Sequence, residues 1–114
     1  MEIKEIAQIL NAKVVCGSEY MDNEITHGFA SDLMSDVLTL DTDKMVLITG
    51  LANLQTIRTV EMSDVNCIVF VRNKQVTPQM LELARLEGLV LMQCEYSMFK
   101  AVGMLYAAGL LPVY

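Results

Sequence analysis

The sequence contains a single histidine, His27, and it is the only side chain expected to change charge near neutral pH. It alternates with Ile25 and Phe29, so these residues share one face of a predicted extended segment. That position fits either a hydrogen-bonded, partly buried histidine or a residue that contacts a ligand. A Ser-His-Asp triad would have to use His27, and no Gly-x-Ser-x-Gly motif occurs. His27 is therefore a candidate binding residue, with no catalytic partner in the sequence.

Two acidic residues, Asp32 and Asp36, are four positions apart in a short helix predicted to begin at Ser31. This spacing places both carboxylates on one helix face, where they could hold a hard cation together with carbonyl and water ligands. A solvated acidic face explains the same pattern. Asp32 would also favour the positive amino end of the helix, for which Ser31 is a natural cap. Two carboxylates alone predict no metal.

The sequence lacks the motifs with which many enzymes bind phosphates or metals. Gly-x-x-x-x-Gly-Lys-Ser/Thr and Gly-x-Gly-x-x-Gly are both absent, which excludes a P-loop and a Rossmann fingerprint. Cys16, Cys67 and Cys94 lie among apolar residues and form no Cys-x-x-Cys pair, so we expect them in the core. The sequence thus predicts no cofactor, no metal and no catalytic turnover.

Length and composition indicate one domain over residues 1–114, because domains usually have about 100–150 residues. Eight basic and fourteen acidic residues give a net charge of −6 without a Lys/Arg cluster, which argues against binding to nucleic acid. The polar, acidic start does not resemble a secretory signal, and the apolar stretch 98–114 is shorter than the roughly 20 residues of a membrane span. We therefore expect a cytoplasmic protein without a membrane partner.

The spacing of apolar residues predicts alternating helices and strands. Helices are expected at residues 2–10, 31–40, 53–62, 77–88 and 97–108, and strands at 12–16, 25–30, 45–49, 67–71 and 89–92. The last three strands are apolar on both faces, which is typical of a parallel sheet covered by helices. In the short helix, Leu33 and Val37 should point inward and Met34 outward. The predicted fold is α/β, a single compact layered domain with a mostly parallel sheet flanked by helices.

The carboxyl ends of the strands are the preferred place for a ligand in such a sheet, because helix amino termini present unpaired N–H groups there. Gly50 at one strand end would let a backbone approach a ligand closely, and Arg72 is the one cation among the ends. Ordinary turn residues would give the same pattern. The candidate ligand-binding residues, for a small anionic metabolite such as a nucleotide, are Ser31, Asp32, Thr49, Gly50 and Arg72, with His27 as a further candidate.

The segment from Ile25 to Leu38 reads Ile-Thr-His-Gly-Phe-Ala-Ser-Asp-Leu-Met-Ser-Asp-Val-Leu. It resembles the signature of the DRTGG-domain family, whose members carry a similar Thr-Gly-Gly followed by Ser-Asp-Leu-Leu-Ser-Asp-Val-Met. Residues 3–17, 46–54 and 99–110 are also similar to that family, so the resemblance covers nearly the whole chain. The naming residues are only partly matched, because Asn23 stands where an arginine is expected and His27 where a glycine would stand.

The resemblance implies a layered α/β fold similar to the amino-terminal domain of HPr kinase. Domains of this family occur alone, or attached to phosphotransacetylase or to pyrophosphatases that carry CBS nucleotide-sensing modules. These attached domains imply a regulatory, ligand-sensing or assembly role, and they do not identify a ligand.

The apolar content predicts an oligomer, because 54% of the residues are hydrophobic and a small domain cannot bury them all. The excess apolar residues lie in two segments. One is 92–114, whose predicted helix is apolar on all sides, and the other is 33–40, where Met34 is expected on the outer side. A second copy would cover these residues, unless the terminal segment folds back on its own sheet. Two functions therefore stay open. One is a non-catalytic regulatory or ligand-sensing module that forms a homodimer or higher homo-oligomer, and the other is an accessory subunit acting only through protein contacts.

Overall fold

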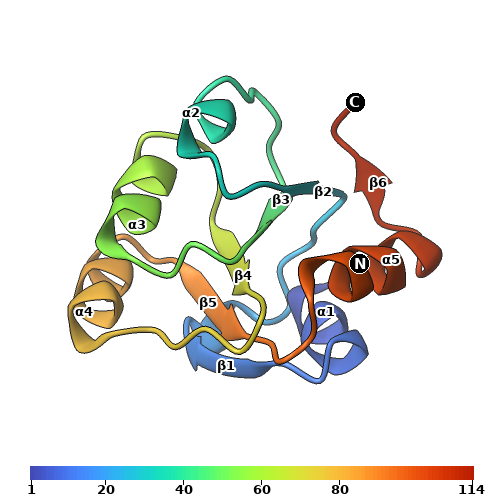
Figure 1. Cartoon of the computed structure of the whole chain (residues 1–114), viewed down its shortest axis with the longest axis horizontal. Coiled ribbons are helices and arrows are strands. Elements are labelled where there is room, and N and C mark those ends of the chain that lie inside the picture. The colour runs from blue at the N-terminus through green and yellow to red at the C-terminus, as the bar shows by residue number, and fades with distance from the viewer.

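A six-stranded, mostly parallel sheet forms the centre of the protein in the computed structural model, which describes residues 1–114 (Figure 1). The strands lie in the order β1-β5-β4-β3-β2-β6, and only β1 is antiparallel to its neighbour. The strands are β1 Lys13–Cys16, β2 His27–Ala30, β3 Met45–Thr49, β4 Cys67–Phe70, β5 Val90–Gln93 and β6 Leu111–Pro112. The helices are α1 Ile3–Ile9, α2 Met34–Val37, α3 Leu54–Glu61, α4 Pro78–Leu86 and α5 Met98–Ala107, with a 3₁₀ turn, η1, at Ser18–Tyr20. The predicted α/β fold is confirmed.

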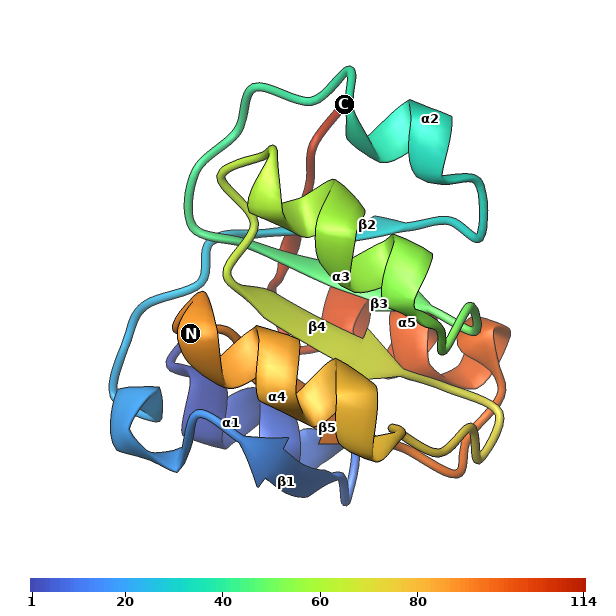
Figure 2. The same cartoon turned by 90° about the vertical axis from the view of Figure 1, so that its left-hand side faces the viewer.

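Helices cover both faces of the sheet, with α2, α3 and α4 on one side and α1 and α5 on the other (Figure 2). Alternate residues of β3 divide between the two layers. Val46 and Ile48 pack toward α1 and α5, whereas Met45 and Leu47 pack toward the other three helices. Every residue of β3 and β4 is buried, which explains why these strands are unbroken apolar runs in the sequence.

Three helices begin at side chains that cap them. Asn53, Thr77 and Ser97 each accept a hydrogen bond from the backbone N–H three residues later. Each bond satisfies one of the donors that the first turn of a helix leaves unpaired. Pro78 follows Thr77 at the start of α4, as the Thr-Pro pair predicts.

The segment after β2 differs from the prediction. α2 begins at Met34, and Leu33 before it is extended, so Asp32 lies outside the helix and does not share a helix face with Asp36. The exposed fraction is 4% for Met34 and 58% for Leu33, so the predicted orientations of these two residues are wrong. The cause is the later start of the helix, which turns Met34 and Val37 together toward the sheet. Only the inward position of Val37 is confirmed.

The two edge strands are the least regular part of the sheet. β1 pairs with β5 across an irregularity between Val14 and Cys16. β6, which was not predicted, pairs with β2 through only two residues, so part of the terminal segment does fold back on its own sheet. The three cysteines are buried and free, which confirms their expected place in the core. No helix has the length and apolar character that a membrane crossing requires.

Candidate functional site

The carboxyl ends of β2 and β3 are joined by the side chain of Asp32. Its Oδ1 atom accepts hydrogen bonds from the Gly50 N–H, at 2.7 Å, and from the Thr49 hydroxyl, at 3.0 Å. The Thr49 oxygen in turn accepts a hydrogen bond from the Leu51 N–H at 3.1 Å. Parallel pairing of β2 with β3 brings these residues to the same edge of the sheet.

Arg72 completes the cluster from the end of β4. Its Nη1 atom lies 3.3 Å from Oδ2 of Asp32. The guanidinium also covers Gly50, because a Cβ at position 50 would overlap its atoms. The side chains of Arg72 and Asp32 are 46% and 45% exposed, so solvent reaches this ion pair. The space beside Gly50, where the sequence predicts a close approach to a ligand, is occupied by the Arg72 guanidinium.

The backbone at the end of β4 fixes where the Arg72 side chain starts. Arg72 and Asn73 both adopt left-handed conformations, with φ of 61° and 58°, which non-glycine residues rarely adopt. The Arg72 N–H donates to the Tyr96 carbonyl at 2.8 Å, and the Asn73 N–H donates to the Cys94 carbonyl at 3.0 Å. Two hydrogen bonds to the loop between β5 and α5 thus offset the unfavourable turn.

The electrostatics of the cluster keep Asp32 ionised. The hydrogen bond from the Gly50 N–H is the largest cause that holds the pKa of this carboxyl below its usual value, and the Thr49 hydroxyl and Arg72 act in the same direction. Partial burial opposes them. A negative charge therefore lies among the donors at the ends of β2, β3 and β4.

The structure brings together four of the six candidate residues: Asp32, Thr49, Gly50 and Arg72. Ser31 lies beside them and orders the approach to α2, since its Oγ accepts a hydrogen bond from the Leu33 N–H at 3.0 Å. His27 does not join the cluster. It is the first residue of β2, paired with Met45 at the amino edge of the sheet, about 10 Å along the strand from Ala30. Its Nδ1 lies 2.7 Å from the Thr26 hydroxyl oxygen, which fits the half-buried, hydrogen-bonded alternative.

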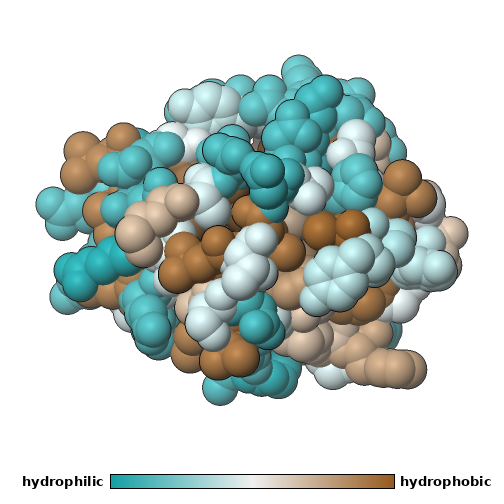
Figure 3. Space-filling model, turned by 90° about the horizontal axis from the view of Figure 1, so that it is seen from above, coloured by the Kyte–Doolittle hydropathy of each residue, from teal (hydrophilic) through white to brown (hydrophobic).

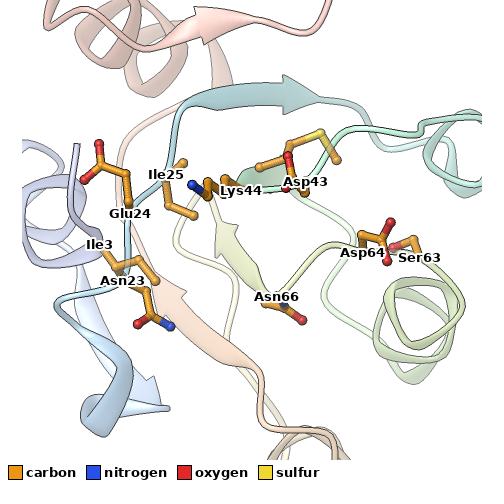
Figure 4. A pocket seen from close by; sticks show the side chains of 10 residues that line it. Ile3, Asn23, Glu24, Ile25, Asp43, Lys44, Ser63, Asp64 and Asn66 are labelled. Atoms are coloured by element: carbon orange, nitrogen blue, oxygen red, sulfur yellow. The ribbon is translucent and has the colours of Figure 1, made fainter.

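A hollow of about 540 Å³ lies at the opposite, amino edge of the sheet, where the sequence predicts no site (Figure 4). Buried Ile3, Ile25 and Met45 contribute to its lining. Its polar residues are Asn23, Glu24, Asp43, Lys44, Ser63, Asp64 and Asn66, which come from the loops before β2, β3 and β4. Polar residues just before buried strands are the signal that sequence reasoning overlooked. No group of three or more His, Cys, Asp or Glu side chains in the structure could hold a metal ion.

The outer face of α5 is apolar and uncovered. Phe99 is 91% exposed and Tyr106 is 66% exposed, and a Cβ at Gly103 between them would meet nothing. A small apolar groove of about 90 Å³ separates this helix from β2 and β6. Figure 3 shows hydrophobic residues exposed across the middle of the molecule and toward the side on which α5 and β6 lie in Figure 1.

The fold and the comparisons with known proteins agree on the class of this chain. It belongs to the DRTGG domain family, whose pattern it matches over residues 5–108. Its structure is similar to that of the CBS and DRTGG domains of the regulatory region of Clostridium perfringens pyrophosphatase, solved in complex with the activator diadenosine tetraphosphate, with a TM-score of 0.73 and 13% sequence identity. The match covers 98% of this chain and 48% of the other, so this chain spans about half of the solved region. A search of curated proteins found no match.

Proposed function

We propose that residues 1–114 act as one non-catalytic regulatory domain that senses a small anionic metabolite such as a nucleotide. The observation that carries the proposal is the convergence of three donors on the carboxylate of Asp32. They are the Gly50 N–H, the Thr49 hydroxyl and the Arg72 guanidinium. Phosphate oxygens accept hydrogen bonds from the same kinds of group, and guanidinium groups suit them especially well. The donors lie at the strand ends where parallel sheets commonly bind ligands.

The relative with a similar fold supports a regulatory role. It is the regulatory region of a pyrophosphatase and was solved with a nucleotide activator. That region also contains CBS domains, so we extend only the class of ligand to this chain. We place the domain in the cytoplasm, since its three free thiols suit a reducing compartment.

Calorimetry and thermal unfolding with AMP, ATP, diadenosine tetraphosphate and pyrophosphate test this proposal. A ligand that binds only the folded protein raises its melting temperature, by an amount that grows with ligand concentration. Arg72→Ala should weaken binding at least about tenfold, because it removes a charged donor. Arg58→Ala on α3 is the matched control, since it removes the same charge from an exposed arginine outside the cluster. Equal affinities of the two variants would remove the proposed site.

A second candidate function is assembly through protein contacts, as an accessory subunit or a homodimer. The uncovered apolar face of α5 favours it, because a helix apolar on its outer face is normally covered. We propose a homodimer in which this face, defined by Phe99, Val102 and Tyr106, meets its copy about a twofold axis. Gly103 lies within the same face and would let the two helices approach closely.

Light scattering over a range of micromolar concentrations tests the dimer. The mass should rise toward twice that of the monomer, and Phe99→Glu should return it to the monomer value. Leu86→Glu on α4 is the control, because Leu86 is 78% exposed and lies on another helix. A monomer mass at every concentration would remove the dimer. A dimer that tolerates Phe99→Glu would remove the choice of surface.

A further inference from the structure

The donors of the candidate site already hold an oxyanion. The carboxylate of Asp32 takes the Gly50 N–H and the Thr49 hydroxyl on one oxygen and faces Arg72 with the other. This is the arrangement in which one phosphate or carboxylate group of a ligand would be bound. The site is therefore filled by the protein's own side chain.

We propose that Asp32 is an exchangeable internal ligand, and that a phosphate or carboxylate group of a metabolite binds by taking its place on Gly50, Thr49 and Arg72. This inference rests on the proposed function and adds its regulation. Binding is coupled to release of the Asp32 side chain, and so to the segment that connects β2 to α2.

Two of the three donors, the Thr49 hydroxyl and the Gly50 N–H, are held in place independently of Asp32. Thr49 is fully buried at the end of β3, and its hydroxyl oxygen is fixed by the Leu51 N–H. Gly50 contributes a main-chain N–H directly after the same strand. The backbone of Arg72 is anchored by its hydrogen bond to the Tyr96 carbonyl. We call Gly50, Thr49 and Arg72 the cradle. Its Thr49 and Gly50 donors therefore persist when Asp32 leaves, and the Arg72 guanidinium, whose only side-chain partner is Asp32, can turn to the incoming anion.

The occupant is held far less firmly than the cradle. The Asp32 side chain is 45% exposed, and all of its hydrogen bonds go to the three cradle residues. It belongs to neither β2 nor α2, and the next residue, Leu33, is 58% exposed. A rotation of one side chain toward solvent is enough to vacate the cradle. A bound anion would repel the Asp32 carboxylate electrostatically. The segment between β2 and α2 would then lack the hydrogen bonds that Asp32 makes to the end of β3.

The exchange has a measurable consequence for affinity. When only a small fraction of the protein molecules has a conformation that can bind the ligand, the apparent affinity for the ligand is reduced by that fraction. If Asp32 fills the cradle more than about nine-tenths of the time, its removal should tighten anion binding at least about tenfold. A ligand that bound beside Asp32, without displacing it, would gain only from the loss of one nearby negative charge.

The test uses inorganic phosphate as the probe and the Gly50 amide resonance of the full chain as the readout. Titrations compare the native protein with Asp32→Ala, Asp32→Asn and the control Asp36→Ala. Asp36 is an exposed residue of α2 whose carboxylate has no hydrogen-bond or ion-pair partner, so the control makes the same charge change nearby. Asp32→Asn keeps the shape of the side chain, and it replaces the alanine variant if circular dichroism shows that variant to be unfolded.

The expected result is an affinity for phosphate that rises at least about tenfold in Asp32→Ala, less in Asp32→Asn and little in Asp36→Ala. Adding Arg72→Ala to Asp32→Ala should abolish the gain. A gain in Asp32→Ala no larger than that in Asp36→Ala would overturn the exchange, while Arg72-dependent nucleotide binding by the native protein would leave the proposed function intact. Conversely, a tenfold gain together with no nucleotide binding would support the cradle and end the proposed function. No Gly50 shift in any variant at millimolar phosphate would overturn the cradle itself.

Discussion

The guanidinium of Arg72 occupies the space that a side chain at position 50 would need, so Gly50 and Arg72 lie in direct contact at the ends of β3 and β4. The same guanidinium faces Asp32 from the other side. Three strand ends are therefore linked through one arginine. A change at any of the three residues should be detectable at the other two.

Gly50→Ala should displace Arg72 and weaken its ion pair with Asp32. Because the guanidinium is the flexible end of an exposed side chain, it can move, and the free energy of unfolding should fall by no more than about 1 kcal/mol. Urea unfolding measures this change. Gly103→Ala is the control, measured at a concentration at which the protein is a monomer, because a Cβ there meets nothing within the chain and alanine in a helix is favoured by about 0.5–1 kcal/mol. A decrease in the free energy of unfolding of Gly50→Ala well above about 1 kcal/mol would show that Arg72 cannot move aside.

Asp32→Asn should destabilise the protein at neutral pH and not in strong acid. The folded protein lowers the pKa of Asp32, chiefly through the Gly50 N–H, so this carboxylate adds stability above its unfolded pKa, near 3.8. That contribution is lost as the pH falls through the lower folded pKa. Urea unfolding of both proteins at pH 7 and near pH 2.5 measures the difference between their free energies of unfolding. If this difference is the same at both pH values, the ionised form of Asp32 adds no stability.

The three cysteines should be unreactive in the folded protein. Burial raises the pKa of the Cys67 thiol to about 12 and raises those of Cys16 and Cys94 as well, so few thiolates form at neutral pH. A colorimetric thiol reagent should titrate all three only after denaturation. Fast reaction of one thiol in the native protein would point to local opening at that cysteine.

Purified protein should show no steady turnover of ATP or of acyl donors. The only hydroxyl paired with a carboxylate in the cluster is that of Thr49 with Asp32, and Thr49 is fully buried in this arrangement, while His27 lies at the other edge of the sheet. Product formation followed over hours measures this. Turnover that a substitution of Asp32 or Arg72 abolished would make the domain an enzyme.

The sheet and its helical layers could be predicted from the sequence because β3 and β4 are buried on both faces and have no polar interruption. β6 could not, since a two-residue strand containing Pro112 has no periodicity to detect. The orientations of Leu33 and Met34 depended on where a four-residue helix starts, and a small shift in that start reverses them.

The candidate site was predictable to the level of the sheet edge. Strand order places Thr49, Gly50 and Arg72 together once a parallel sheet is assumed. The role of Asp32 as the group that fills the site was not predictable, because it depends on Asp32 lying outside α2, where its side chain reaches β3. The hollow at the amino edge was missed for a different reason, since the rule for parallel sheets directs attention only to the carboxyl edge.

The most direct test of the central claim follows the amide resonances of the native protein during a titration with ADP. We expect the Gly50 and Thr49 resonances to shift and saturate, and we expect Arg72→Ala to suppress these shifts while Arg58→Ala retains them. Shifts confined to the amino edge, at Lys44 and Asn66, with Gly50 unmoved, would contradict the account and place the ligand in the hollow on the other side of the sheet.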